Sequence, residues 1–227
     1  MNRSVDSIIT DVRTCINENA DNEADMMMVT VDDSELDHLI RSKIAEAIDF
    51  VHGNADVSLL AGDTISYSTD SDAVVKSDGS VDVELSEESG NVLRVVGAKL
   101  GTWTAMVRDV VSGLDTHRCA MITAAHAGAN HQRPAAIRRY DSGKYILSLY
   151  RSGSESKDSV TVAYLRHADM PEGDASGTVA VDKNLYTAIV NYCAALVYTT
   201  LGQTDRVKEM AELATVEMGI NSGEQNQ

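Results

Sequence analysis

The C-terminal part of the chain places its apolar residues with the period of an α-helix. From Leu185 to Leu201 they recur at spacings of three and four, at Leu185, Tyr186, Ile189, Val190, Cys193, Leu196, Val197 and Leu201. This spacing stacks side chains on one helical face. Asp182 is suited to cap the start of the helix, and Gly202 can take the left-handed conformation that ends it. The pattern predicts a buried helix.

A second helix is predicted directly after the first. Thr204 or Asp205 can cap it and Gly219 can close it. Its apolar stripe consists of Val207, Met210, Ala211, Ala214 and Met218. The two helices together predict a helical pair whose apolar faces need a covering surface, which we expect other subunits to supply in part.

Two amphipathic helices are predicted near the N-terminus. The first follows Ser4, with apolar positions Val5, Ile8, Ile9, Val12, Cys15 and Ile16. The second is capped by Asp32 or Asp33 and stopped by Gly53, with apolar positions Leu36, Leu39, Ile40, Ile44, Ala47, Ile48 and Val51. Between them, Met26–Val31 fits either a short strand or an extended lead-in.

The middle of the chain changes to the period of two that is typical of β-strands. The predicted strands are Ala73–Lys76, Val81–Leu85, Val92–Val96, Ala136–Tyr140, Lys144–Arg151 and Ser159–Arg166. Asp78-Gly79 suits a tight hairpin turn, and Asp141-Ser142-Gly143 marks a second hairpin. Ala98–Val111 fits either a strand pair or a short helix.

These segments predict an α+β fold. Its helical core comes from residues 1–60 and 182–219, and an antiparallel β-rich insertion spans residues 61–181. Within the insertion, residues 167–181 are predicted to form a long loop. Residues 220–227 are polar and predicted to be a flexible tail.

Charge is large and unevenly distributed. The chain has 35 acidic and 19 basic residues, a net charge of −16, which argues against binding nucleic acid through the bulk surface. Residues 1–60 hold 13 acidic and 4 basic residues, whereas residues 131–170 hold 4 acidic and 7 basic. A basic face on an acidic protein suits head-to-tail contact between copies or an acidic partner. A solvated surface with chance clustering explains the counts equally well.

Cysteine content and hydropathy indicate the compartment. Cys15, Cys119 and Cys193 are odd in number and far apart, so we expect small buried side chains rather than disulfides, and synthesis in a reducing cytosol. The first residues are charged and predict no signal peptide. The longest apolar run, Leu185–Leu201, contains Asn191 and is too polar for a membrane span.

Motifs for chemistry are absent from the sequence. The six histidines lack metal-ligand spacing, and Asp70-Ser71-Asp72 starts like a calcium loop but lacks its glycine and final glutamate. No phosphate-binding glycine loop and no serine nucleophile elbow occurs. We therefore expect no enzymatic activity, metal or cofactor. The alternative from a different class is a metal-assisted hydrolase using His126, His131 and Asp141.

Tyrosine and arginine gather in the basic segment. The residues are Tyr140, Tyr145, Tyr150 and Tyr164, near Arg138, Arg139, Arg151 and Arg166. Such mixtures are enriched at protein interfaces. Tyrosines half-buried across a sheet face are the other interpretation for any single residue. As a group they predict an interface, with Arg138, Arg139, Tyr140, Tyr145, Tyr150, Arg151 and Arg166 as its candidate residues.

Three stretches resemble a known family. AIVNYCAALVYTTLGQTDRVKEMAELA, at the helical pair, is similar to the head-to-tail connector (adaptor or ring) proteins of tailed bacteriophages. VLRVVGAKLGTWTAMVRDVV and HQRPAAIRRYDSGKYILSLYRSG resemble ring proteins of short-tailed, crAss-like phages of gut Bacteroidales. The resemblance covers about residues 33–215. It implies a helical core with a β-rich lobe, repeated as a ring, commonly of twelve, beneath the portal.

The resemblance also implies a role. We expect a virion structural protein at the head–tail junction, made in the host cytoplasm, that extends the DNA channel and docks the tail without enzymatic activity. Its partners would be its own copies, the portal protein and further ring or tail proteins, with double-stranded DNA passing unbound and no membrane. Met210, Met218 and Ile220 are then candidate apolar anchors for a tail that orders on a neighbouring ring. An internal core position is the other interpretation of Met210. The alternative role is another phage structural component, such as a tail-completion or accessory head protein.

Overall fold

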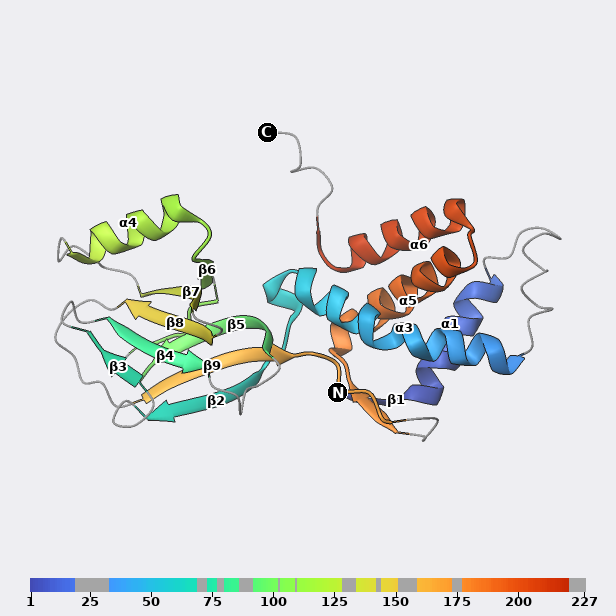
Figure 1. The fold of residues 1–227 in the computed structure, drawn as a ribbon, viewed down its shortest axis with the longest axis horizontal. Coiled ribbons are helices and arrows are strands. Elements are labelled where there is room, and N and C mark those ends of the chain that lie inside the picture. Colours follow the sequence, from blue (N-terminus) through green and yellow to red (C-terminus); the bar gives the residue numbers. More distant parts are fainter. Residues whose placement is uncertain are drawn as a thin grey trace. The chain divides into compact units, whose positions relative to one another are not determined.

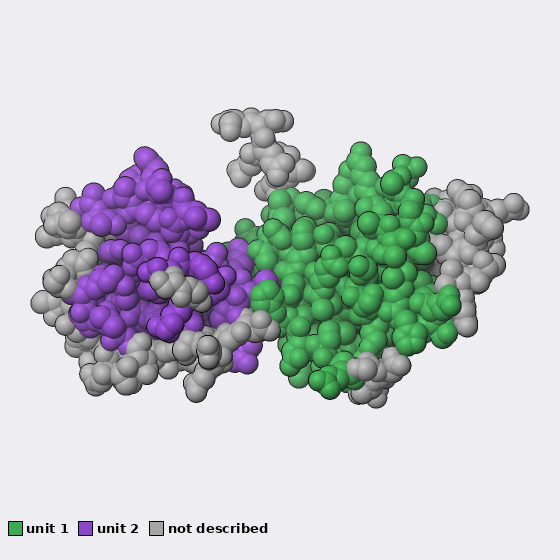
Figure 2. Space-filling model, in the orientation of Figure 1, with its two compact units in different colours: residues 1–61, 167–227 green, residues 62–166 purple. Residues whose placement is uncertain are grey.

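The chain folds into two compact units, coloured separately in Figure 2. The computed structural model describes residues 1–18, 33–68, 73–76, 80–85, 92–101, 103–108, 110–127, 134–141, 144–150, 159–172 and 177–220. Unit 1 comprises residues 1–61 and 167–227, and unit 2 comprises residues 62–166. Unit 1 is mainly helical and unit 2 is rich in strands, so the predicted α+β fold with a β-rich insertion is confirmed.

Unit 1 is built around one buried helix. Its helices are α1 (Val5–Glu18), α3 (Asp33–Asn54), η2 (Val57–Leu59), η4 (Lys183–Leu185), α5 (Tyr186–Thr200) and α6 (Thr204–Glu217). α5 packs against α1, α3 and α6 (Figure 1). It buries Ala188, Ile189, Val190, Asn191, Cys193, Ala194, Ala195, Val197 and Tyr198. Such burial explains why its sequence is apolar on nearly all sides.

The ends of α5 and α6 follow from local chemistry. Asp182 is a cap, but it serves the short η4 turn: its carboxylate accepts the Asn184 N–H at 3.1 Å. Gly202 and Gly219 follow α5 and α6 with φ of +76° and +73°, a conformation that favours glycine. Both predicted glycine stops are confirmed. Neither Thr204 nor Asp205 occupies the cap position of α6, which belongs to Gln203.

The two N-terminal helices form with the predicted faces inward. The fully or nearly fully buried positions are Val5, Ile8, Val12 and Ile16 in α1, and Ile40, Ile44, Ala47, Ile48 and Val51 in α3. The predicted stop at Gly53 is wrong. α3 continues to Asn54, whose side-chain amide donates to the Phe50 carbonyl at 2.8 Å, and the Ala55 N–H still reaches the Val51 carbonyl at 2.9 Å. The helical hydrogen bonds therefore run past the glycine.

The predicted boundary of the insertion is also wrong at its C-terminal side. Residues 167–172 and 177–181 belong to unit 1, where β1 (Asn2–Ser4) pairs antiparallel with β10 (Thr178–Ala180). The Val5 N–H donates to the Gly177 carbonyl at 3.0 Å, and the Val181 N–H donates to the Met1 carbonyl at 2.8 Å. These backbone bonds hold the segment against the N-terminus. Three residues per strand are too few to show periodicity in the sequence.

Unit 2 contains two sheets. Its strands are β2 (Asp63–Ser68), β3 (Ala73–Val75), β4 (Val81–Leu85), β5 (Val92–Leu100), β6 (Val110–Ser112), β7 (Ala135–Asp141), β8 (Lys144–Tyr150) and β9 (Ser159–Arg166). One sheet has the order β2-β9-β5 and the other β3-β4-β8-β7-β6. The pairs are antiparallel except β6 with β7, which is parallel and departs from the prediction. Their shared core includes Val81, Val83, Ala98, Leu100, Leu147, Leu149, Val160 and Val162.

Some elements of unit 2 were not anticipated. Neither β2 nor α4 (Thr116–Ala127) is among the predicted elements. For Ala98–Val111 the structure is closer to the strand pair than to the helix. β5 continues to Leu100, the chain returns at the antiparallel Ala98–Val107 bridge, and β6 begins at Val110. Met26–Val31 and the turn Asp78-Gly79 lie outside the described residues, although β3 and β4 do pair as predicted.

Two carboxylates fix the segments by which the chain leaves and re-enters unit 1. Asp182 accepts the Ala61 N–H at 2.7 Å through Oδ2. Asp49 accepts the Ala168 N–H at 2.8 Å through Oδ1 and contacts His167 Nδ1 at 2.7 Å through Oδ2. Both crossing points are therefore tied to helical unit 1 by charge-assisted hydrogen bonds.

Behind Asp182 lies a buried neutral histidine. His52 is 5 % exposed, and its Nε2 accepts the Asp182 N–H at 3.3 Å, so this nitrogen carries no proton. Burial lowers the pKa of His52, although the nearby carboxylates of Asp182 and Asp49 oppose that shift. The unfolded chain therefore takes up a proton at a higher pH than the folded chain does.

This imbalance predicts a loss of stability on acidification. As the pH falls below the ordinary histidine pKa of about 6.5, His52 should lower the free energy of unfolding by up to about 1.4 kcal/mol per pH unit. In His52→Gln, whose amide oxygen can still accept the Asp182 N–H, that part of the slope should disappear. Urea unfolding followed by helical circular dichroism measures both slopes. Equal slopes would refute a depressed pKa at His52.

Met218 provides a test of the core of unit 1. Its side chain is 1 % exposed, so Met218→Ala should lower the free energy of unfolding by about 2–5 kcal/mol through lost burial and the cavity left behind. Val216→Ala, on α6 at 71 % exposure, should change it by less than about 0.5 kcal/mol. Chemical denaturation measures both, and similar losses would contradict this assignment.

Candidate interface on the β-rich unit

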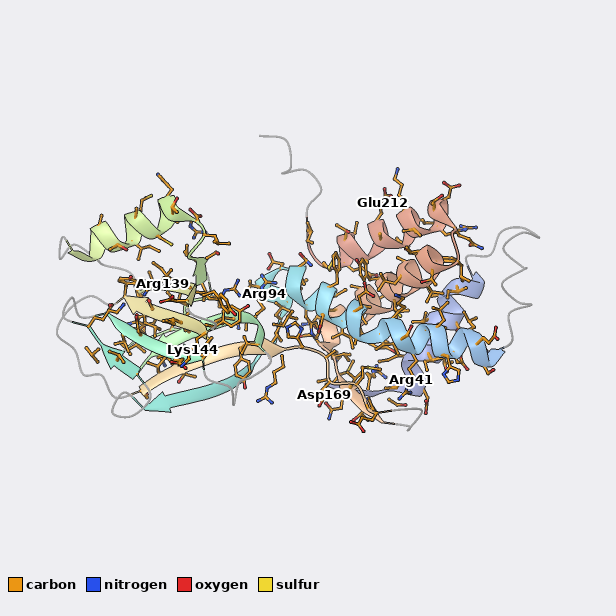
Figure 3. The ribbon with its side chains drawn as sticks, viewed as in Figure 1. Arg41, Arg94, Arg139, Lys144, Asp169 and Glu212 are labelled. Carbon is orange, nitrogen blue, oxygen red and sulfur yellow. The ribbon has the colours of Figure 1, made fainter. Side chains whose placement is uncertain are left out.

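The predicted arginine–tyrosine segment forms the β7–β8 hairpin. Tyr140 pairs with Tyr145, and Asp141 pairs with Lys144 at the turn end. Successive strand residues point to opposite faces. Arg138 and Tyr140 therefore share one face of the hairpin, and Arg139 lies on the other. Figure 3 labels Arg139 and Lys144 on this unit.

On the first face, two tyrosines and one arginine gather. The rings of Tyr140 and Tyr145 meet edge-on, with centroids 4.9 Å apart and an interplanar angle of 60°. The guanidinium of Arg138 lies 6.0 Å from the Tyr145 ring centroid, at the outer limit of a cation–π contact. Tyr140 is 66 % exposed and Tyr145 38 %, so this cluster presents aromatic surface to solvent. Exposed, pre-packed aromatic rings with an arginine are typical of interface anchors.

On the opposite face, charged residues form a network across three strands. Asp82 Oδ2 lies 2.5 Å from Lys76 Nζ and 3.4 Å from an Arg139 nitrogen, and Arg139 also donates to the Ser148 hydroxyl. The Asp82 side chain is only 15 % exposed. One partly buried carboxylate is thus shared by two cations, which fixes the Arg139 side chain against the sheet.

A hollow of about 790 Å³ lies at the turn end of the β7–β8 hairpin, and residues from both faces of the hairpin line it. It is lined by Lys76, Asp82, Ser112, Gly113, Leu114, Arg138, Arg139, Tyr140, Asp141, Tyr145 and Ile146. Leu114, which follows β6, is 92 % exposed. We call these lining residues the hairpin surface. Its apolar walls and arginines suit a partner that offers apolar side chains beside carboxylates.

The structure separates the other predicted interface residues from the hairpin surface. Tyr150 is 7 % exposed and packs with Val111 and Ile137, beneath α4. Arg166 lies on β9 in the other sheet, where it donates to the hydroxyl of the buried Tyr164 at 2.7 Å. Arg151 lies outside the described residues. The residues of the predicted cluster therefore lie in two different sheets, and Tyr150 is buried in a core.

The methionines of the proposed tail anchor are core residues. Met210 is fully buried on α6, and Met218, the residue directly after this helix, is 1 % exposed. Neither is available as a surface anchor in the folded unit, so the prediction for Met218 is corrected. Ile220 is half-buried just after α6. The tail beyond it lies outside the described residues.

The hydrolase constellation is not assembled among the described side chains. Asp141 is exposed at the end of β7, whereas His131 and the His126 side chain lie outside the described part of the chain. Within that part, no group of three or more His, Cys, Asp or Glu residues could hold a metal ion. No helix there is long and apolar enough to cross a membrane.

Of the eleven residues of the hairpin surface, the sequence placed four in the predicted interface, Arg138, Arg139, Tyr140 and Tyr145, and missed the other seven. Lys76 and Asp82 come from a hairpin some 60 residues earlier in the chain, and only the β4–β8 pairing brings them to Arg139. In β4, Asp82 lies between the buried Val81 and Val83 and points to the opposite face. Leu114 could not be predicted as part of this surface, because a single apolar residue after a short strand shows no hydrophobic periodicity.

The Asp82 network gives a prediction for unit 2. Asp82→Asn leaves two cations beside a partly buried neutral group, so the free energy of unfolding should fall by about 1–3 kcal/mol. Glu84→Gln is the matched change, because Glu84 lies on the same strand as Asp82, β4. It removes an exposed carboxylate that lies 2.6 Å from Lys144, and it should lower the free energy of unfolding by less than about 1 kcal/mol. Fluorescence of Trp103, buried in the core of unit 2, reports the unfolding. Equal costs would contradict a special role for Asp82.

The comparisons with known proteins add no family to this geometry: no protein-family model matches the chain, and no curated protein matches it significantly.

Proposed function

We propose that this chain is a virion structural protein that assembles into a ring between the portal and the tail of a bacteriophage. The supporting observation is the segregation of charge between its two units. Unit 1 holds 22 acidic and 7 basic residues, and unit 2 holds 13 acidic and 12 basic, so charges of −15 and −1 make up the total of −16. One chain thus carries two electrostatically different bodies.

Two unlike surfaces on one chain favour head-to-tail assembly. A contact between different patches of identical subunits closes into a ring when its rotation permits, and each copy then uses both patches. The hairpin surface supplies exposed tyrosine, leucine and arginine side chains. The acidic exterior of unit 1 supplies the complementary charge. Like-charged contacts between two copies of unit 1 are disfavoured by the same charges.

The charge also suits a DNA channel. Phosphates are bound through clustered lysine and arginine, and a wall with excess carboxylates repels them. Double-stranded DNA would then pass through the ring without being held. The resemblance of three stretches to connector proteins of tailed phages supports the same role, with docking of the tail and binding of the portal protein as its function.

Mass measurement tests this proposal. Light scattering should show a concentration-dependent assembly well above the monomer mass of 24.4 kDa, reaching about 290 kDa if twelve copies close a ring. Raising the salt concentration should weaken the assembly severalfold, because added ions screen attraction between exposed charges. Gel retardation of double-stranded DNA should be absent even at low salt.

Two outcomes would contradict the proposal. One is a chain that stays a monomer at every concentration. The other is tight, salt-sensitive DNA binding, since the channel wall would then retain the passing genome. Electron micrographs of the assembled material separate closed rings from open filaments.

A further inference from the structure

The exposed side of α6 offers unpartnered apolar surface on unit 1. Among the described residues of this unit, the exposed large hydrophobic side chains are Met1, Phe50, Leu213 and Val216. Phe50 stacks on Tyr192 with ring centroids 3.9 Å apart. Leu213 and Val216, at 46 % and 71 % exposure, stand one helical turn apart on α6. They form a short apolar ridge on the helix.

Carboxylates flank this ridge. Glu209 and Glu212 are exposed on the same side of α6, and Figure 3 shows Glu212 pointing away from the rest of unit 1. Glu212 lies 3.9 Å from Lys208 Nζ, with both side chains more than two-thirds exposed, so that pair is weak. Ile220, half-buried just beyond the helix, extends the apolar surface. We call Glu209, Glu212, Leu213, Val216 and Ile220 the α6 ridge.

We propose that the α6 ridge of one copy docks on the hairpin surface of a second copy of this chain. This inference rests on the proposed ring and names the contact that builds it. The apolar side chains match: Leu213 and Val216 have the aliphatic shape that packs against exposed aromatic rings such as those of Tyr140 and Tyr145. The hollow beside these rings provides the concave partner for a convex helix.

Charge makes the two surfaces complementary. The ridge carries two carboxylates: Glu209 lies 2.9 Å from Arg206, and Glu212 is only loosely paired with Lys208. The hairpin surface carries Arg138 beside its tyrosine rings. Of the two acidic residues in the hollow, Asp82 is shared by Lys76 and Arg139. The other, Asp141, lies at the exposed turn end of β7. The hollow is therefore lined by three cations, Lys76, Arg138 and Arg139, against two carboxylates, and this excess of positive charge suits the glutamates of α6.

The second copy is the occupant that the charges favour. α6 belongs to the unit with a charge of −15, and the hairpin surface belongs to the unit that is nearly neutral and bears the arginines. Every copy has both surfaces. A row of copies joined by this contact therefore ends in a free α6 ridge on one side and a free hairpin surface on the other. Such a contact continues until a ring closes.

Blocking one surface at a time tests the contact. Val216→Asp disables the ridge and Tyr140→Asp disables the hairpin surface, and both positions are exposed enough to leave the fold intact. Each variant alone should remain a monomer of 24.4 kDa. A mixture of the two should form a dimer of about 49 kDa and nothing larger, because each variant retains the surface that the other lacks. Light scattering on a sizing column reads all three masses.

Met121→Asp is the matched control. Met121 is 60 % exposed on α4 and belongs to neither surface. This variant should assemble as the unchanged chain does. Circular dichroism of all variants should match the unchanged chain.

The outcomes separate this inference from the proposed function. If the unchanged chain assembles and both single variants assemble equally well, the contact proposed here is wrong and the ring stands. A mixture that stays monomeric also overturns the contact. If the unchanged chain itself never assembles, the proposed ring fails, and this contact fails with it.

Discussion

The structure of unit 1 depends on the need to cover α5 on every side. Its sequence offers apolar or small side chains around most of its circumference, so one neighbouring helix cannot shield it. α1 and α3 come from the start of the chain, and α6 follows α5 directly. The N- and C-terminal segments must therefore fold together. The β-rich unit is an insertion because it lies between segments that a single core requires.

This constraint also explains how the insertion is anchored. Residues Ala61 and Ala168 flank the crossings into and out of unit 2, and each backbone N–H is bound by a carboxylate of unit 1. Asp182 contributes three hydrogen bonds at once: its carboxylate accepts from Ala61 and Asn184, and its own N–H donates to His52. Asp182, which the sequence marks as a simple cap, therefore joins three segments of unit 1: α3, the end of the segment that leads to unit 2, and the η4 turn.

The helices around α5 turn their apolar faces toward it, which leaves their outer faces polar. In unit 1 as a whole, acidic residues outnumber basic ones about threefold. Repulsion among like charges lowers stability while it keeps copies of this unit apart. A protein that tolerates this cost gains from contacts with a different, less acidic surface. On α6, the exposed apolar side chains Leu213 and Val216 are the part of unit 1 that such a contact would cover.

The extent to which the sequence predicted the structure follows from the length of each element. Helices of fourteen or more residues repeat their apolar spacing several times, so α1, α3, α5 and α6 were all predicted with the buried face inward. β1 and β10 have three residues each and were missed, because pairing between residues about 175 positions apart defines them. α4 was missed because, among its described side chains, only Cys119 and Ile122 pack on the neighbouring core cluster.

The candidate site illustrates the same limit at the level of side chains. The sequence placed Arg138, Arg139, Tyr140 and Tyr145 in one hairpin, and the structure confirms that hairpin. It could not assign Asp82, which arrives from β4 and neutralises Arg139, so two adjacent arginines differ in what they offer a partner. Arg138 shares its face with the buried Leu147 and lies beside the Tyr145 ring. Arg139 lies on the other face and is more exposed, but Asp82 and Ser148 hold it there. The alternation of the strand, and not the local density of arginine, therefore decides which neighbours each of the two cations has.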